Sequence, residues 1–164
     1  MEEIKEDKAM IIKSKSFENN GMIPKKHTGF GEDKSPELTI SDIPDSTVSL
    51  AIIMDDLDVP FRDYFTHWLI WNIPGTEIIE EGLPGGEKIE SPFSAIQGVA
   101  WGKHIYRGPK QPFFIRKEHR YVFYVYALDC MLNLTGMAGK KELVDAMKGH
   151  VLSEAKLMGR YKPD

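Results

Sequence analysis

Continuous runs of apolar residues dominate the middle of the chain, and they predict buried β-strands. One run covers residues 48–54, a second covers residues 67–73, and a third covers residues 121–128. The third run is the most β-prone, because aromatic and β-branched residues fill it. Shorter patterns at residues 10–17 and 37–40 predict two further strands. Regular alternation along the second run predicts one shared face for His67, Leu69, Trp71 and Ile73.

Near the C-terminus the apolar spacing changes to that of a helix. After Lys140, apolar side chains fall along one helical stripe, at Leu143, Val144, Met147, Val151, Ala155 and Met158. This stripe predicts an amphipathic helix. Gly149 interrupts it, and a glycine inside a helix costs about 1 kcal/mol relative to alanine. The sequence therefore leaves open one long helix or two short helices that meet near Gly149.

The order of these elements indicates a mostly-β protein. Strands come first, the helix comes last, and loops rich in glycine and proline separate them. This order predicts a β-sandwich with appended helices. A chain of 164 residues is long enough for a proper hydrophobic core, so we expect a single domain over residues 1–164, with residues 1–9 as a loose start.

Composition and charge exclude several classes of function. The net charge of −4 gives no support for binding to nucleic acid or to an anionic membrane surface. No segment approaches the roughly 20 apolar residues of a membrane span, and the charged N-terminus is not a secretion signal, so the expected location is the cytoplasm. The single cysteine, Cys130, excludes an internal disulfide and a cysteine-based zinc site, and we expect it to be a small core residue.

Candidate chemistry gathers where the first apolar run ends. Asp56 and Asp58 are two residues apart, so they project to the same side if the backbone stays extended. His67 opens the next apolar run, which places two carboxylates and an imidazole at one rim of the predicted sheet. A purely structural interpretation also stands, because aspartates readily cap a turn before a residue such as Pro60, and His67 alone would be an ordinary strand-end histidine.

Five pieces of the chain match one protein family in the same order. They are GEDKSPEL at residues 31–38, DLDVP at 56–60, HWLIWNIP at 67–74, YRGP at 106–109 with HRYVF at 119–123, and AMKGHVL at 146–152 with GRY at 159–161. With these pieces the chain resembles the phosphatidylethanolamine-binding protein family, most closely its bacterial and archaeal Raf kinase inhibitor-like branch. The resemblance extends from about Phe17 to Tyr161.

The resemblance implies a fold and a site. The fold is a β-sandwich with a large antiparallel sheet and peripheral helices, and the site is a pocket for small anions such as phosphate or phosphorylethanolamine. Carried over by motif, the pocket residues are Asp56, Asp58, Pro60, His67, Gly108, Pro109, His119 and Tyr121. The Val59–Pro60 bond matches one that is usually cis in the family. The chain departs from the family pattern at the rim, where Trp101, Arg107 and Lys110 predict a shifted ligand preference.

We expect a non-enzymatic binding or regulatory protein that needs no cofactor. One alternative is a serine-protease inhibitor or another protein-binding module that acts through the loops at residues 22–35 or 85–112, with a protease or kinase as partner. Another is a metal-assisted phosphoester hydrolase, since Asp56, Asp58, His67 and His119 supply suitable ligand atoms. No compact metal-ligand motif or recognisable nucleophile supports the hydrolase. The resemblance also implies a homodimer, because prokaryotic members of the family are often homodimers.

Overall fold

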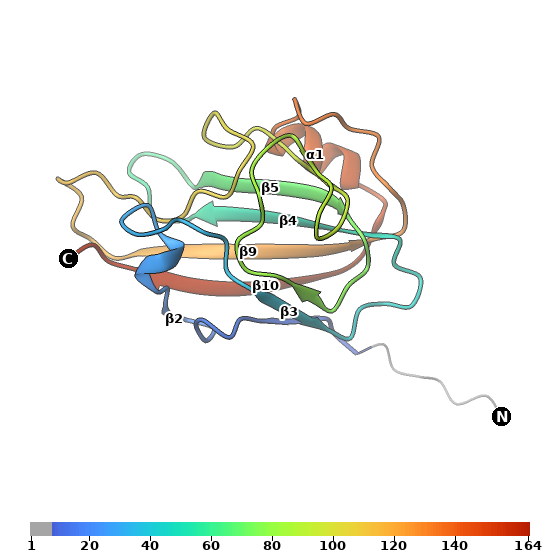
Figure 1. The fold of residues 1–164 in the computed structure, drawn as a ribbon, viewed down its shortest axis with the longest axis horizontal. Coiled ribbons are helices and arrows are strands. Elements are labelled where there is room, and N and C mark those ends of the chain that lie inside the picture. Colours follow the sequence, from blue (N-terminus) through green and yellow to red (C-terminus); the bar gives the residue numbers. More distant parts are fainter. Residues whose placement is uncertain (1–7) are drawn as a thin grey trace.

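The computed structural model describes residues 8–164 and shows two β-sheets with one α-helix (Figure 1). Residues 1–7, most of the predicted loose start, lie outside the described residues. The strands are β1 (Ile11–Lys13), β2 (Gly21–Met22), β3 (Leu38–Ser41), β4 (Ser49–Asp56), β5 (Phe65–Ile73), β6 (Ile78–Ile79), β7 (Lys88–Ile89), β8 (Ala95–Gln97), β9 (His119–Leu128) and β10 (Val151–Tyr161). The helices are the 3-10 helix η1 (Lys25–His27) and the α-helix α1 (Lys140–Met147).

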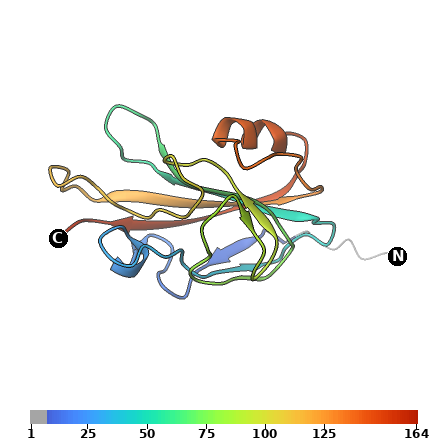
Figure 2. The ribbon, with the colours of Figure 1, turned by 45° about the horizontal axis from the view of Figure 1, so that its top comes forward.

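The larger sheet has seven strands in the order β2-β10-β9-β4-β5-β8-β7. All neighbours in it are antiparallel except β2 and β10, which are parallel. The smaller sheet has the order β1-β3-β6 and covers one face of the larger sheet, while α1 lies against the other face (Figure 2). The predicted mostly-β sandwich with a large, chiefly antiparallel sheet is therefore confirmed.

Apolar side chains fill both faces of the large sheet. One cluster lies toward the small sheet and includes Ile52 and Phe123, and a second lies beneath α1 and includes Ile53 and Leu143. Every residue of β4 is buried. Because both faces of β4 are covered, its sequence is a continuous apolar run rather than an alternating one.

The predicted C-terminal helix is wrong beyond Met147. The helix ends there, Gly149 adopts a φ of +81°, and the chain continues as β10 along the whole of β9. An apolar spacing of four residues fits a strand as well as a helix, because four is also a multiple of the strand period of two. The buried positions of β10, among them Ala155 and Leu157, follow the strand period.

The predicted shared face of β5 is also wrong, because the strand contains two irregularities. Asp55 pairs with Thr66 and Met54 pairs with Trp68, so His67 is an extra residue between two pairs. An extra residue of this kind turns the following side chains to the other face. As a result, His67 lies against Tyr121 on the side of the first cluster, whereas its neighbours two and four residues on, Leu69 and Trp71, belong to the second. Ile73 rejoins the first cluster after Asn72, whose φ is +57°.

The turn after β4 differs from the one implied by the family resemblance. Within residues 8–164 the cis peptide bond is Ser91–Pro92, and Val59–Pro60 is not cis. The turn is instead closed by the Asp58 N–H group, which donates to Asp56 Oδ1 at 2.8 Å.

The longest helix of the described chain is α1, with eight residues. Neither helix has the length and apolar content that a bilayer crossing requires.

Candidate functional site

A pocket of about 240 Å³ opens at the end of the large sheet where β4 ends and β9 begins. It is lined by Asp56, Val59, Pro60, Phe65, His67, Trp101, Lys110, Gln111, Pro112, Ile115, His119 and Tyr121. Of the residues predicted from the sequence, the structure thus brings together Asp56, Pro60, His67, His119 and Tyr121, with Trp101 and Lys110 from the predicted rim. Sequence reasoning missed Val59, Phe65, Gln111, Pro112 and Ile115.

Asp58 does not line this pocket. Its carboxylate accepts hydrogen bonds from the backbone N–H of Arg120 at 2.7 Å and from the Arg120 guanidinium at 2.9 and 3.0 Å. These bonds lower the pKa of Asp58. The turn that bonds Asp58 N–H to Asp56 bends the backbone, so the expectation that both carboxylates project to one side does not apply.

Asp56 and His119 form a buried pair at the centre of the pocket. His119 Nδ1 lies 2.7 Å from Asp56 Oδ2, and each side chain is only 5% exposed. Since a carboxylate accepts, Nδ1 carries the hydrogen of this bond. The second ring nitrogen, Nε2, has no hydrogen-bond partner within residues 8–164 and remains for a ligand.

His67, by contrast, is held by a backbone carbonyl and not by a carboxylate. Its Nδ1 lies 2.7 Å from the backbone carbonyl of Arg107, and because a carbonyl only accepts, Nδ1 must donate. Burial lowers the pKa of His67, although the bond to Arg107 and the nearby Asp56 act against that shift. The ring is therefore neutral at pH 7, with an acceptor lone pair on Nε2. The pocket thus offers Nε2 of each histidine to a ligand, and on the neutral His67 this atom is an acceptor.

Tyr121 closes the inner wall between the two histidines. Its ring centroid lies 5.5 Å from that of His67 and 6.4 Å from that of His119. Burial, reinforced by the Asp56 carboxylate, raises the pKa of Tyr121 far above its usual range. The phenol hydroxyl therefore stays protonated.

Gly108 is structural in this fold, and its partner Asp33 was missed in the sequence. The Gly108 N–H donates to Asp33 Oδ1 at 2.7 Å, and burial raises the pKa of Asp33. A Cβ atom at position 108 would lie 1.9 Å from the carbonyl oxygen of His27. Only glycine allows this approach. Neither Gly108 nor Pro109 lines the pocket; the Pro109 carbonyl accepts from the N–H of Gly29.

The rim is formed by stacked cations and aromatic rings. The Arg107 guanidinium lies 3.8 Å from the centre of the Trp101 ring and donates to the Trp101 carbonyl at 2.9 Å. Arg107 thereby fixes the indole beside His67, at 5.1 Å between ring centres, without lining the pocket itself. Lys110 lies 4.3 Å from the Phe30 ring and is the one lysine among the pocket-lining residues.

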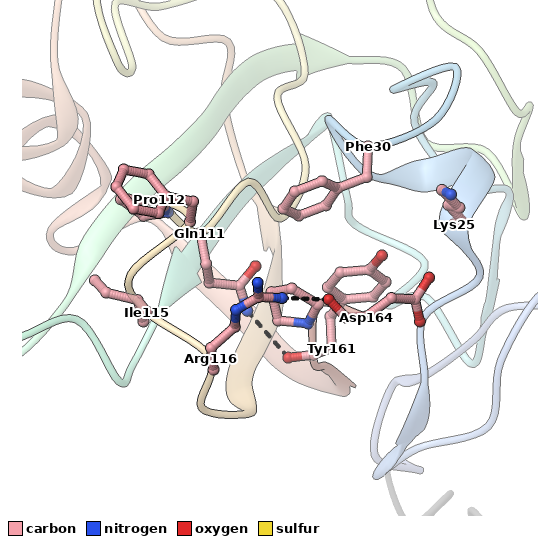
Figure 3. Close-up of a pocket in the computed structure, with 10 residues that line it drawn as sticks. Lys25, Phe30, Gln111, Pro112, Ile115, Arg116, Tyr161 and Asp164 are labelled. Carbon is pink, nitrogen blue, oxygen red and sulfur yellow. Dashed lines mark hydrogen bonds between the residues drawn. The ribbon is translucent and has the colours of Figure 1, made fainter.

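A second hollow of about 220 Å³ adjoins the pocket across the segment 111–115 (Figure 3). Gln111 lines both spaces. Its amide Nε2 donates to the Tyr161 carbonyl at 3.1 Å, while its buried Oε1 has no partner within residues 8–164. In Figure 3 the amide lies between Phe30 and Arg116, and Arg116 donates to the Asp164 carbonyl. The segment thus separates the two hollows, and Gln111, Pro112 and Ile115 line both of them.

The acids and histidines at the pocket do not gather as metal ligands. Among residues 8–164, no three of Asp56, Asp58, His67 and His119 bring ligand atoms within 4.8 Å of one another. The geometry fits reversible polar recognition: a buried acid–imidazole pair, a neutral acceptor imidazole, a protonated phenol and one lysine.

Fold and pocket together describe a β-sandwich with a cavity at one end of its central sheet. The chain belongs to the phosphatidylethanolamine-binding protein family, because the family model of that description matches residues 13–162. The resemblance inferred from the five sequence motifs is thereby confirmed at the level of the family.

Relatives of known sequence and structure agree with this assignment. The chain is 43% identical over 158 residues to a UPF0098 protein of Pyrococcus horikoshii, covering 96% of this chain and 79% of that protein. The crystal structure of a phosphatidylethanolamine-binding protein homolog from Chlamydia trachomatis is similar, with a TM-score of 0.84, 36% identity, and coverage of 95% of this chain and 99% of that one. Escherichia coli YbcL shares the fold at a TM-score of 0.83 and 22% identity, over 96% of this chain and 100% of its own.

Proposed function

We propose that this protein is a non-enzymatic binding protein whose pocket holds the phosphate group of a small ligand. The observation that carries the proposal is the buried Asp56–His119 pair, whose imidazole keeps Nε2 free in the pocket. Asp56 already accepts from two donors, His119 and the N–H of Asp58. Its negative charge is therefore directed at the imidazole and not at the ligand.

A phosphate monoanion matches the remaining groups. Nε2 of His119 offers one polar contact to the phosphate. The ionised oxygens of the phosphate accept from the Lys110 ammonium, since hydrogen bonds between charged groups are the strongest of their kind. The P–OH group of the phosphate donates to the neutral Nε2 of His67. Near pH 6, the second pKa of a phosphomonoester, both protonation states are present, so the ligand can supply the donor as well as the acceptors.

The rest of the pocket favours an organic phosphate over a bare ion. Val59, Phe65 and Ile115 contribute apolar surface around the polar centre. Burial of apolar ligand surface there contributes about 25 cal/mol per Å². We therefore propose a phosphorylated head group or metabolite, such as phosphorylethanolamine, as the ligand class.

Two observations favour binding over hydrolysis. The Tyr121 hydroxyl stays protonated and makes a poor nucleophile, because burial and Asp56 raise its pKa. Asp58, one of the four ligands of the hypothetical metal centre, is engaged with Arg120 outside the pocket. A hydrolase would need both the metal and a rearranged Asp58.

An NMR titration tests the proposal. The ¹⁵N-labelled protein is titrated with phosphate and with phosphorylethanolamine, beside His119→Ala, His67→Ala and the control Asp58→Asn. We expect saturable shifts at Asp56, His67 and Tyr121 in the wild type and in the control, with a tighter response to phosphorylethanolamine. Loss of the response in His119→Ala supports the pocket. No saturable shift in the wild type, or equal shifts in His119→Ala, would refute it.

A further inference from the structure

A group of side chains with the atoms to bind a metal ion lies at the opposite end of the large sheet from the pocket. Asp129 and Cys130 directly follow β9, and His150 directly precedes β10. Because β9 and β10 are antiparallel neighbours, the three residues meet beside the same end of this strand pair. With ten residues in β9 at about 3.3 Å each, they lie about 30 Å from His119 at its start. This group is therefore independent of the pocket.

The three side chains converge on one point. One ligand atom from each, a carboxylate oxygen, the thiol sulfur and a ring nitrogen, lies within 4.8 Å of the other two. His150 Nδ1 and Asp129 Oδ1 are only 2.8 Å apart. Within residues 8–164, these are the only three histidine, cysteine or acidic side chains that meet this distance criterion.

Backbone and side-chain hydrogen bonds hold the three residues in place. The Asp129 N–H donates to the His150 carbonyl at 3.0 Å, which joins the two segments directly. The Ser49 hydroxyl donates to the Cys130 carbonyl at 2.6 Å. Gly149, with its φ of +81°, makes the turn that returns the chain from α1 to His150. A ligand set fixed in this way loses little conformational entropy when an ion binds.

We propose that Asp129, Cys130 and His150 bind one divalent ion of the Zn²⁺ class, with water in the fourth position. A thiolate, an imidazole and a carboxylate form a mixed donor set that suits Zn²⁺ and its substitute Co²⁺ and disfavours Mg²⁺ and Ca²⁺. The sequence excluded a site built on cysteines because it has one, but a mixed set needs only one thiolate. On binding, the metal displaces the thiol proton of Cys130, which goes to solvent, and the ring hydrogen of His150 moves from Nδ1 to Nε2, so that Nδ1 offers its lone pair to the ion.

The side chains of Asp129 and His150 are 44% and 46% exposed, so the ion would be open to solvent on one side. Three protein ligands with an open position are typical of exchangeable or catalytic zinc rather than of closed structural zinc. In a tetrahedral zinc site the ligand atoms lie about 2.0–2.3 Å from the ion, and exposed side chains can adjust from their present positions to reach that geometry.

Cobalt spectroscopy on the full chain provides the test. Metal-free protein is titrated with CoCl₂, and we expect a thiolate-to-cobalt charge-transfer band in the near ultraviolet with visible bands of tetrahedral intensity. The bands should saturate at one Co²⁺ per chain and disappear when Zn²⁺ is added. Cys130→Ser should abolish the charge-transfer band, and His150→Ala should weaken Zn²⁺ binding in calorimetry by at least about tenfold.

A matched control separates a built site from general attraction of cations. Asp145→Asn removes an exposed carboxylate outside the group, and it should bind Co²⁺ as the wild type does. Circular dichroism checks that each variant is folded, and if Cys130→Ser fails this check, His150→Ala decides the outcome. Absence of the charge-transfer band in the wild type, or wild-type affinity in His150→Ala, would overturn the proposal.

Discussion

Asp56→Asn is the substitution that most directly tests how the pocket is stabilised. Asparagine keeps the size of the side chain and removes its charge. The Asp56 carboxylate uses one oxygen to accept from His119 and the other to accept from the N–H of Asp58. An amide has a single acceptor oxygen, so one of these two donors must lose its acceptor.

The magnitude follows from the burial of the pair. Both side chains are 5% exposed, so water cannot replace the lost hydrogen bond. Leaving a buried polar group without its partner destabilises a protein by about 1–3 kcal/mol, and by more when the group is charged. His119 can limit that loss, because it can move its hydrogen to Nε2 and accept from the new amide. We therefore expect the free energy of unfolding to fall by about 2 kcal/mol, the range for a hydrogen bond to a charged group.

Urea unfolding at pH 7, followed by tryptophan fluorescence, measures this change. Asp58→Asn is the matched control: the chemical change is the same, but Asp58 is 29% exposed and its partner Arg120 is 51% exposed. Exposed ion pairs contribute little, so we expect a clearly smaller loss. If Asp56→Asn and Asp58→Asn shift the midpoint equally, the reasoning that the Asp56–His119 pair is buried and stabilising is refuted.

Three further predictions address other parts of the structure. Burial lowers the pKa of His67 in the folded state, so the contribution of His67 to stability is present above the unfolded pKa of about 6.5 and is lost as the pH falls from 6.5 toward the folded pKa. In His67→Gln, the fall of the urea midpoint between about pH 6.5 and 5 should therefore be less steep than in the wild type. An unchanged slope would contradict this reasoning. Asp33→Ala leaves the buried N–H of Gly108 without its acceptor and should lower the free energy of unfolding by about 1–3 kcal/mol, measured by urea unfolding; a variant as stable as the wild type would show that water replaces the carboxylate. Gly108→Ala should be destabilised by at least about 3 kcal/mol or fail to fold, because the new Cβ would lie 1.9 Å from the carbonyl oxygen of His27. In the control Gly75→Ala the atom nearest to the new Cβ lies at 3.9 Å, so the melting temperature of this variant should stay near that of the wild type.

The strands were predictable where burial alone determines them. The continuous apolar run of β4 and the aromatic run of β9 must be buried whichever strands they pair with, so the local sequence is enough to predict both strands. The C-terminal segment was not predictable in this way. Its apolar spacing satisfies both periods, and the exposed edge of β9, which needs a partner strand, determines the outcome. Pairing with a strand distant in the sequence leaves no signal in the segment itself.

Some features of the pocket could likewise be predicted from the sequence, and others could not. Asp56, His67 and His119 lie at strand ends, and the ends of neighbouring strands meet, so their meeting could be expected from the chain order. The orientation of Asp58 could not, because it depends on a turn that a single hydrogen bond closes. The contacts of Gly108 depend on Asp33, which lies 75 residues away in a loop. Loop-to-loop contacts have no periodicity from which to predict them.

The two outermost strands of the large sheet, β2 and β7, contain only two residues each. A sheet edge attracts a further chain in proportion to the row of unpaired N–H and C=O groups that it presents. On the β2 side, however, only Gly159 and Arg160 of β10 have strand partners, so most of this eleven-residue strand lies along an edge that β2 does not cover. Residues 151–157 of β10 are therefore the part of the sheet edge to which a strand of a second molecule could add. A homodimer that joins two large sheets into one would form along this stretch of β10.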